Sequence, residues 1–283
     1  MSSKLQNFLT SNVRTQKLIR AGEIAQLHNF IRALLDSPRN AEASRLLKYG
    51  YRVYSQADED GILREIFRRI GEGNRRFVEL GVGDGLENNT LFLLVQGWNG
   101  IWIEGSERKA AAARKHLAAV ISEKRLRLDH HFITVPTIDK KIASFAGERD
   151  VDLLSVDLDG NDYYILEAIR SISPRVIVAE YNSKFPPDVS WIIEYNEGHR
   201  WDSTDYFGAS LKSLETLLAG RGYSLVGCNI LGTNAFFVRT DLVGDAKFSA
   251  PFTPQNHYEP SRYFLLPAFH AGYPVNFGPF RTK

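Results

Sequence analysis

The stretch Glu79-Leu80-Gly81-Val82-Gly83-Asp84-Gly85 closes a short apolar run that begins at Arg76. The run predicts a buried strand, and open α/β sheets bind their ligands at the carboxyl ends of parallel strands. Three glycines at alternate positions leave the backbone bare, so that a ligand can approach it closely. We therefore expect a ligand-binding loop here; a tight strand-to-helix turn without a ligand is the alternative.

Two well-known glycine-rich loops do not match this stretch. A P-loop needs a Gly-Lys-Ser/Thr step, which the chain lacks. The dinucleotide pattern G-x-G-x-x-G also fails, because Leu86 and Asn88 stand where its third Gly or Ala would fall. With Glu79 at its start and no clear phosphate cradle, the loop favours a nucleoside ligand with a cationic or zwitterionic tail.

A second acid stands at the end of the next predicted strand, Gly100–Glu104. It follows the glycine loop by about twenty residues, a spacing at which acids of nucleotide-binding sheets accept hydrogen bonds from ribose hydroxyls. Glu104 is therefore a candidate ribose ligand. The alternative is a surface carboxylate at a strand end.

Strand and helix patterns alternate on both sides of the loop. Strands are expected at 76–82, 100–104, 126–134, 151–157 and 175–180, and helices at 62–70, 90–96, 110–121, 138–145, 163–169 and 211–218. Ser106 and Thr137 are the expected caps of two of these helices. Apolar strands separated by helices indicate an α/β fold whose parallel sheet is covered on both faces. The stretches 223–229 and 234–239 predict a hairpin that ends the sheet with an antiparallel edge strand.

The chain divides into three parts by pattern. Residues 1–50 carry apolar side chains at spacings of three and four, which predicts a helical arm interrupted at Ser37-Pro38. We expect this arm to pack on the protein or to form a homo-oligomer. Residues 51–243 hold the α/β domain. Residues 244–283 form a tail without periodicity, rich in aromatic residues, that we expect to be a lid or an interface.

Composition limits the class of protein further. The 283 residues are 43% hydrophobic and 24% charged, ordinary values that exclude a disordered or fibrous chain. A net charge of +2, from 35 Lys and Arg against 33 Asp and Glu, argues against a nucleic-acid partner. The single cysteine, Cys228, excludes a disulfide framework and a cysteine-based zinc site. Without a long apolar run or a signal-peptide core, we expect a cytoplasmic protein with no membrane partner.

The pattern E-x-G-x-G-x-G, followed by an acid at the end of the next strand, resembles class I S-adenosylmethionine-dependent methyltransferases. Three further segments resemble the FkbM-like branch of that class: Ser55–Gly61 (SQADEDG), Asp152–Asp162 (DLLSVDLDGND) and Ala179–Asn182 (AEYN). The resemblance covers about residues 52–240. It implies a Rossmann-like sheet of seven strands, bound S-adenosylmethionine and usually O-methylation of a sugar or natural-product hydroxyl. The expected partner is thus a small-molecule acceptor.

The resemblance also assigns roles to residues. It places Glu79 and Gly81 near the methionine part of the cofactor, Glu104 on the ribose, and residues 132–134 beside the adenine. The full set of expected cofactor-binding residues is Gln56, Glu79, Gly81, Gly83, Gly85, Glu104, Gly105, Ile133 and Asp157. Two departures leave the acceptor open. Asp157-Leu158-Asp159-Gly160 stands where relatives more often have Asp-x-Glu-Gly, and the aromatic tail is not a general feature of the family.

Acidic residues gather after the fourth and fifth predicted strands. They can orient the donor ammonium, act as a general base or bind a divalent cation. Helix capping by Asn161 or Asp162, with Asp157 bonded to backbone amides, is the structural alternative. We expect a metal-free reaction in which Asp159 or His199, from the loop after the fifth strand, takes the acceptor's proton. If the protein uses Mg²⁺ instead, its expected ligands are Asp157, Asp159, Glu180 and Asn182.

Other functions remain open on the sequence alone. The same residues fit an N-methyltransferase that acts on a small molecule. A nucleotide-dependent oxidoreductase on a Rossmann sheet is disfavoured by the missing third glycine and by the terminal hairpin. A methyltransferase-like module without catalysis, which assembles through residues 1–50, is the remaining alternative.

Overall fold

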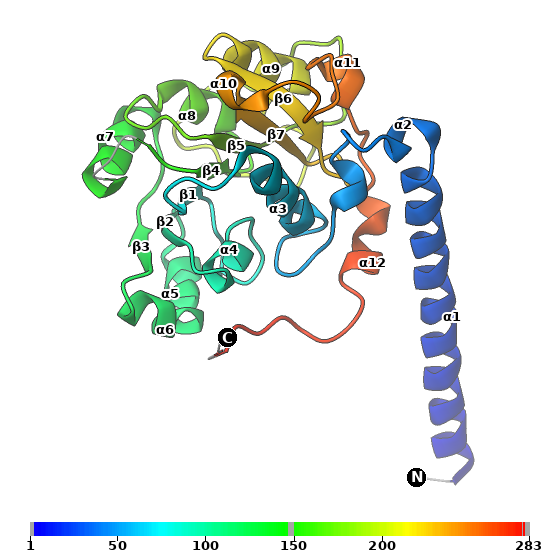
Figure 1. Cartoon of the computed structure of the whole chain (residues 1–283). Coiled ribbons are helices and arrows are strands. Elements are labelled where there is room, and N and C mark those ends of the chain that lie inside the picture. Colours follow the sequence, from blue (N-terminus) through cyan, green and yellow to red (C-terminus); the bar gives the residue numbers. More distant parts are fainter. Residues whose placement is uncertain (1–2, 147–149, 279, 281–283) are drawn as a thin grey trace.

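The computed structural model describes residues 3–146, 150–278 and 280. Its strands are β1 (Arg76–Leu80), β2 (Asn99–Glu104), β3 (Leu126–His130), β4 (Leu153–Val156), β5 (Val176–Glu180), β6 (Tyr223–Cys228) and β7 (Asn234–Arg239). They form one sheet of seven strands in the order β3-β2-β1-β4-β5-β7-β6 (Figure 1). Strands β1 to β5 are parallel to their neighbours, and β7 is antiparallel to both β5 and β6. The predicted Rossmann-like, mostly parallel α/β fold with a terminal hairpin is confirmed.

The two strands of the hairpin enter the sheet in the reverse of their chain order. The strand that runs against the others, β7, is not at the edge, because it pairs with β5 on one side and β6 on the other. The crossover through α9 (Leu211–Ala219) places β6 two positions beyond β5 in the sheet. The short turn at residues 229–233 then returns the chain into the space between them.

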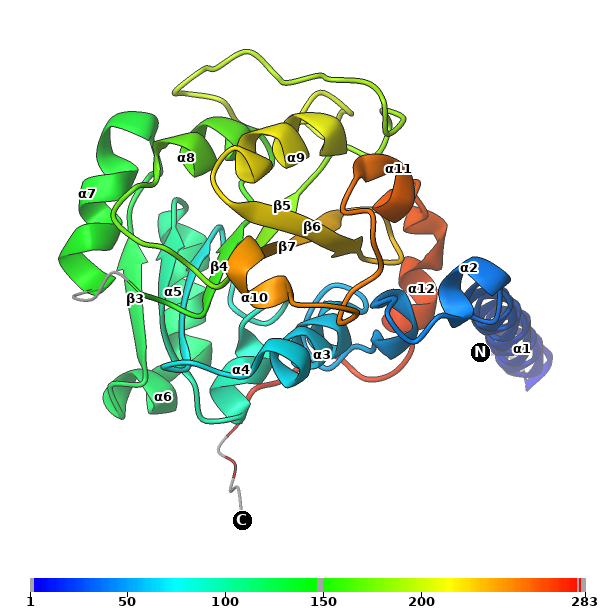
Figure 2. The same cartoon turned by 45° about the horizontal axis from the view of Figure 1, so that its top comes forward.

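Helices cover both faces of the sheet (Figures 1 and 2). One face carries α7 (Val135–Ala146), α8 (Asp162–Ala168) and α9, and the other carries α3 (Glu59–Ile70), α4 (Leu91–Val95), α5 (Glu107–His116), α6 (Ala118–Ser122) and α10 (Thr240–Val243). Side chains of β1 alternate between two cores. Val78 and Leu80 pack toward α7, α8 and α9, and Phe77 packs toward α3 and α4. This burial on both faces is what the apolar strands predict.

Of the two predicted helix caps, the structure confirms one. Ser106 is the N-cap of α5, and its side chain accepts a hydrogen bond from the Lys109 backbone N–H at 3.4 Å, as predicted. The prediction for Thr137 is wrong, because α7 already begins at Val135. Pro136 fits this first turn, since a backbone N–H there would have no partner within the helix.

The N-terminal arm is dominated by one long helix. α1 (Ser3–Leu35) extends away from the α/β body (Figure 1) and ends before Ser37-Pro38, as predicted. α2 (Pro38–Ala41) and the 3-10 turn η1 (Leu47–Tyr49) lead into the domain. The C-terminal end of α1 packs on a small core of residues from η1, the β6–β7 turn and the tail; its own contributions are Leu27, Ile31, Leu34 and Leu35.

The C-terminal tail contains short helices that its sequence does not predict: α11 (Pro254–His257), the 3-10 turn η2 (Tyr263–Leu265) and α12 (Leu266–Phe269). Phe248 and Phe277 are buried in the same core as α3 and α4. The tail is therefore packed on the α/β body at several points. None of the helices in the described ranges has the length and apolar character that a membrane crossing requires.

Candidate active site

A cavity of about 890 Å³ opens beside the carboxyl ends of β1, β2, β4 and β5. Open α/β sheets bind ligands at this edge, and the volume is typical of sites for small molecules and cofactors. Ten residues that the sequence singles out line it: Gln56, Gly81, Gly83, Glu104, Gly105, Ile133, Asp157, Asp159, Glu180 and His199. Three others, Glu79, Gly85 and Asn182, are not among its lining residues.

The three glycines of the loop have the same backbone conformation but different surroundings. Gly81, Gly83 and Gly85 adopt positive φ angles of 81°, 59° and 81°. A Cβ at Gly81 would lie 1.8 Å from the Asp157 carbonyl oxygen, so glycine lets the ends of β1 and β4 close up. A Cβ at Gly85 would press on the Trp102 ring. At Gly83 a Cβ would meet nothing within 4 Å, so this is where bare backbone faces the cavity.

Glu104 is held in place by the backbone of two loops. Its Oε2 accepts a hydrogen bond from the Gly83 N–H at 2.8 Å, and its Oε1 accepts one from the Ser106 N–H at 2.7 Å. An ionised carboxylate has about four acceptor positions, so half of them remain for a ligand. Glu104 is therefore a fixed hydrogen-bond acceptor in the wall of the cavity.

Glu79 serves the fold of the loop. It is 3% exposed and accepts hydrogen bonds from the backbone N–H groups of Asn89 (2.9 Å) and Thr90 (3.2 Å) and from the Thr90 hydroxyl. Burial raises its pKa to about 7, although these hydrogen bonds act in the opposite direction. In this structure Glu79 secures residues 89 and 90 to β1, a contact that the resemblance does not imply.

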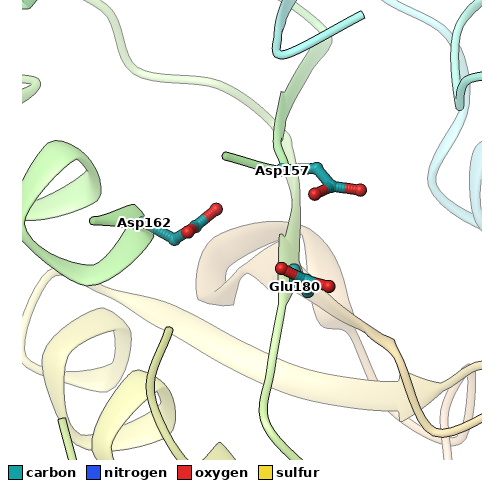
Figure 3. Close-up of side chains that lie close together, drawn as sticks. All are labelled: Asp157, Asp162 and Glu180. Atoms are coloured by element: carbon teal, nitrogen blue, oxygen red, sulfur yellow. The ribbon is translucent and has the colours of Figure 1, made fainter. Parts of the chain in front are cut away.

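Three acids converge where β4 and β5 end (Figure 3). Asp157 follows β4, Asp162 begins α8 and Glu180 ends β5, and one oxygen of each lies within 4.8 Å of the others. Asp162 is the acid that satisfies backbone amides, since it accepts hydrogen bonds from the Leu158 (2.7 Å) and Gly160 (2.9 Å) N–H groups. The structural alternative gave this role to Asp157; the structure gives it to Asp162, because the loop folds back onto the first residue of α8.

Glu180 lacks such partners. Its Oε2 is shielded from solvent, and no hydrogen bond reaches it from the part of the chain that the structure describes. Burial raises the pKa of Glu180 and of Asp157 well above their usual values, and the neighbouring carboxylates raise both pKa values further. The two groups therefore take up protons or a cation more readily than surface carboxylates do.

The two predicted catalytic residues line the cavity side by side. Asp159 has a φ of +54°. Partial burial raises its pKa, although the charges of Lys109 and His199 act in the opposite direction. The His199 ring lies against Gly160, where a Cβ would come within 2.2 Å of it. His199 Nε2 is 3.3 Å from the Asp159 carbonyl oxygen.

Two asparagines hold the loops around the cavity. Asn161 is the N-cap of α8, but its side chain makes no cap hydrogen bond and donates to the Asn196 carbonyl at 2.8 Å. Asn182 donates to the carbonyl oxygens of Asp205 (2.9 Å) and Phe207 (3.1 Å). Among the acids, the group that lies close enough to share a cation contains Asp162 in place of the expected Asp159.

The segment Ser55–Gly61 is mainly structural. Asp60 accepts hydrogen bonds from the backbone N–H groups of residues 53–55 at 2.6–2.9 Å. Glu59 accepts them from the side chains of Asn229 and Asn234, at the β6–β7 turn. These contacts tie the start of α3 to the far end of the sheet, and they place Gln56 in the cavity wall.

The cavity also contains residues that the sequence does not assign to it. The tail contributes Tyr263 and Leu266, and the start of α5 contributes Lys109. Burial, followed by the charges of Glu180 and Asp157, raises the pKa of Tyr263 to about 12, so its hydroxyl stays protonated at neutral pH. The aromatic content of the tail indicates contact with something apolar, but no spacing in it shows which side chain reaches the sheet edge.

Comparison with known proteins adds a fold-level likeness. No protein-family profile matches the chain, and no curated protein is significantly similar to it. It is similar to the solved N-terminal domain of EvdMO1 in the presence of SAH and D-fucose (18% identity, 64% of this chain, 81% of that chain, TM-score 0.41). It is also similar to an S-adenosylmethionine-dependent methyltransferase from Clostridium acetobutylicum (11%, 75%, 98%, 0.39). A third is the magnesium protoporphyrin IX methyltransferase of Synechocystis with bound SAM (13%, 75%, 96%, 0.39). Similarities at this level do not assign a function.

Proposed function

We propose that the chain is an S-adenosylmethionine-dependent methyltransferase of the FkbM-like branch. It transfers the methyl group to a hydroxyl oxygen of a small acceptor such as a sugar or a natural product. The four motif segments at 55–61, 79–85, 152–162 and 179–182 support this assignment, and each of them contributes at least one residue to the same cavity.

One observation carries the proposal: the open backbone at Gly83 lies beside the fixed carboxylate of Glu104, at the carboxyl ends of the adjacent strands β1 and β2. In the proposed complex Glu104 accepts hydrogen bonds from the two ribose hydroxyls. Ile133, which also lines the cavity, would contact the adenine. The cationic methionine end faces Asp157, whose raised pKa falls again when an ammonium group pairs with the carboxylate.

S-adenosylmethionine, when bound, supplies an activated methyl group. The chain's own residues then have two tasks, which are to align the acceptor hydroxyl and to take up its proton. Asp159 and His199 are our candidates for the proton acceptor, because both line the cavity. Tyr263, which stays protonated, donates a hydrogen bond to the acceptor or to a neighbouring carboxylate.

We further propose that the reaction needs no metal, because the ammonium of the cofactor neutralises part of the charge of Asp157 and Glu180. Activity should persist after exhaustive EDTA treatment. Loss of activity that Mg²⁺ or Mn²⁺ restores would contradict this version and make Asp157, Asp162 and Glu180 the candidate ligands.

Calorimetric titration with S-adenosylmethionine and, separately, with NADH tests the class of ligand. Binding of S-adenosylmethionine but not of NADH is the expected result. Binding of NADH alone would favour an oxidoreductase, and a folded chain that binds neither would favour a module without catalysis. Release of S-adenosylhomocysteine with hydroxyl-bearing or amine-bearing acceptors then separates O-methylation from N-methylation.

Asp159→Asn tests the proposed base. We expect kcat to fall about 10²- to 10⁴-fold, the usual range for a lost acid–base group. Asparagine tolerates the positive φ of this position (+54°), so the loop and the affinity for S-adenosylmethionine should survive. Asp188→Asn, at an exposed position that does not line the cavity, is the control. Equal turnover in the two variants would remove Asp159 from the mechanism.

A further inference from the structure

α1 presents more apolar surface than its own chain covers. Every residue from 15 to 23 is exposed, and Val13 and Ile19 are 50% and 57% exposed. Phe30 is still 44% exposed although its ring packs against Phe264, with the ring centroids 5.5 Å apart. The helix is about 50 Å long, and in both views it leaves the α/β body (Figures 1 and 2). A helix that stands alone in water is only marginally stable, and Gly22 near its middle weakens it further. A partner along this helix would cover the exposed apolar side chains and would stabilise the helix.

One face of α1 has the spacing of a coiled-coil seam. Steps of three and four residues alternate through Val13, Gln16, Arg20, Glu23, Leu27, Phe30 and Leu34. A groove of about 580 Å³ follows the middle of this seam, lined by Gln16, Ile19, Arg20, Glu23, Ile24, Gln26, Leu27 and, from α12, Pro267. The groove adjoins the small core that holds the C-terminal end of α1, because Leu27 belongs to both.

The seam is complementary to itself when its direction is reversed. A two-fold axis that passes between Ala21 and Gly22 pairs residues that lie at equal distances on either side of it, one from each copy of the helix. The resulting pairs of seam residues are Val13 with Phe30, Gln16 with Leu27, and Arg20 with Glu23. Apolar residues thus meet apolar or amide side chains, and the two charges meet their opposites. Such a contact is isologous, the type that closes most homodimers.

The charges of α1 favour antiparallel pairing with a second copy of the same helix. Glu23 is the only acidic residue of α1, which contains five Lys and Arg. Parallel pairing would place Arg20 against Arg20 and Glu23 against Glu23, which costs free energy. Antiparallel pairing forms the Arg20–Glu23 pair twice. The copy of the helix in a second chain therefore fits the seam in one orientation.

We propose that α1 is a dimerisation helix, which pairs in antiparallel direction with α1 of a second copy of this chain through the Val13–Phe30 seam. The two α/β bodies then lie at opposite ends of the helix pair. The proposal does not depend on the methyltransferase activity, because its readout is the association state of the whole chain.

Leu18 and Ile19 provide a matched pair of variants. Both are exposed, at 66% and 57%. Ile19 lines the groove along the seam, whereas Leu18, turned by about 100° around the helix, does not. Ile19→Asp should raise the dimer Kd at least about 100-fold in sedimentation equilibrium, and Leu18→Asp should leave it unchanged. Helix content by circular dichroism confirms that both variants are folded. Equal effects of the two, or a wild-type chain that stays monomeric at submillimolar concentration, would overturn the proposal.

Charge reversal tests the pairing itself. Arg20→Glu and Glu23→Arg should each weaken the homodimer about 10-fold, because like charges then face one another. Mixing the two variants should restore association, since each arginine of one chain meets a glutamate of the other. An ion pair within a single helix gives no recovery on mixing, so that outcome would overturn the proposal.

A disulfide tests the direction. The single native cysteine, Cys228, is buried. A mixture of Val13→Cys and Phe30→Cys chains should form an interchain disulfide under mild oxidation, and Val13→Cys alone should not. In the antiparallel pair the two copies of position 13 are about 25 Å apart along the axis, far beyond disulfide reach. Cross-linking of Val13→Cys alone would overturn the antiparallel arrangement.

Discussion

Gly83 and Gly222 share a positive φ, of 59° and 83°, and a Cβ at either would meet no atom within 4 Å. Only Gly83 lines the cavity. Gly83→Val and Gly222→Val should therefore lose similar stability, about 1–3 kcal/mol, because a β-branched residue resists this backbone conformation. We expect Gly83→Val alone to lose binding of S-adenosylmethionine, as measured by calorimetry. Normal binding by Gly83→Val would mean that the loop is only a turn.

Glu180 is a second residue whose surroundings make a sharp prediction. Its folded-state pKa lies well above the ordinary value of 4.5, because of burial and then the charge of Asp157. A raised carboxyl pKa favours folding below the unfolded-state pKa, and this benefit is lost as the pH rises toward the folded-state pKa. Glu180→Gln has no ionisable carboxyl group at this position, so its stability does not fall in this way as the pH rises.

We therefore expect the melting temperature of Glu180→Gln to equal that of the wild type near pH 4 and to exceed it increasingly above pH 4.5. A gain of about 2–4 °C corresponds to about 1 kcal/mol for a chain of this size. Thermal unfolding in the absence of ligand across this pH range measures it. A difference that is the same at every pH would show that charge is not its cause.

At the scale of elements, the tail segment before η2 is clamped to the β6–β7 turn. Glu259 is 3% exposed and pairs with Arg39 of α2 (2.6 Å) and with Arg262 (2.8 Å). The Arg262 N–H donates to the Leu231 carbonyl at 2.9 Å. This clamp fixes the position of Tyr263, the next residue, in the cavity wall. An element from each end of the chain thus shapes one side of the site.

Glu259→Ala should lower the free energy of unfolding by about 3 kcal/mol or more, because it leaves buried Arg262 without its carboxylate. Glu72→Ala, which breaks the exposed pair with Arg75, is the control and should change it by less than about 1 kcal/mol. Denaturant unfolding compares the two. We expect the affinity of Glu259→Ala for S-adenosylmethionine to change little, since Glu104 ends β2 and the clamp lies at the β6–β7 turn, near the opposite edge of the sheet. Equal stability of the two variants would show that the clamp does not hold the tail.

The tail also shows why a lid cannot be deduced from aromatic content. Phe248 and Phe277 fill the core beside α3, while Tyr263 and Leu266 reach the cavity. These destinations depend on how the tail crosses the β6–β7 turn, where a Cβ at Gly232 would lie 2.5 Å from the Pro260 carbonyl oxygen. That contact joins residues far apart in the chain, so it cannot be predicted from local sequence patterns.

At the scale of the whole molecule, local patterns determine the sheet and its ligand-binding edge. Two-sided burial and the place of the cavity follow from apolar runs, helix periodicity and the glycine loop, all of which act over short distances along the chain. The direction of individual carboxylates does not follow. Glu79 is an expected cofactor ligand, and Asp60 and Asp162 lie in motif segments, yet each accepts hydrogen bonds from nearby backbone N–H groups. Buried backbone donors need acceptors, and only the folded loops show which acid supplies them.

The central claim is that the cavity binds S-adenosylmethionine through Glu104, and calorimetric titration of Glu104→Ala tests it most directly. Hydrogen bonds to a charged group contribute about 1.5–3 kcal/mol, so the affinity should fall about 10- to 100-fold. Glu107→Ala, which changes an exposed acid in the first turn of α5, should bind as the wild type does. A folded Glu104→Ala protein with the affinity of the wild type would contradict the account.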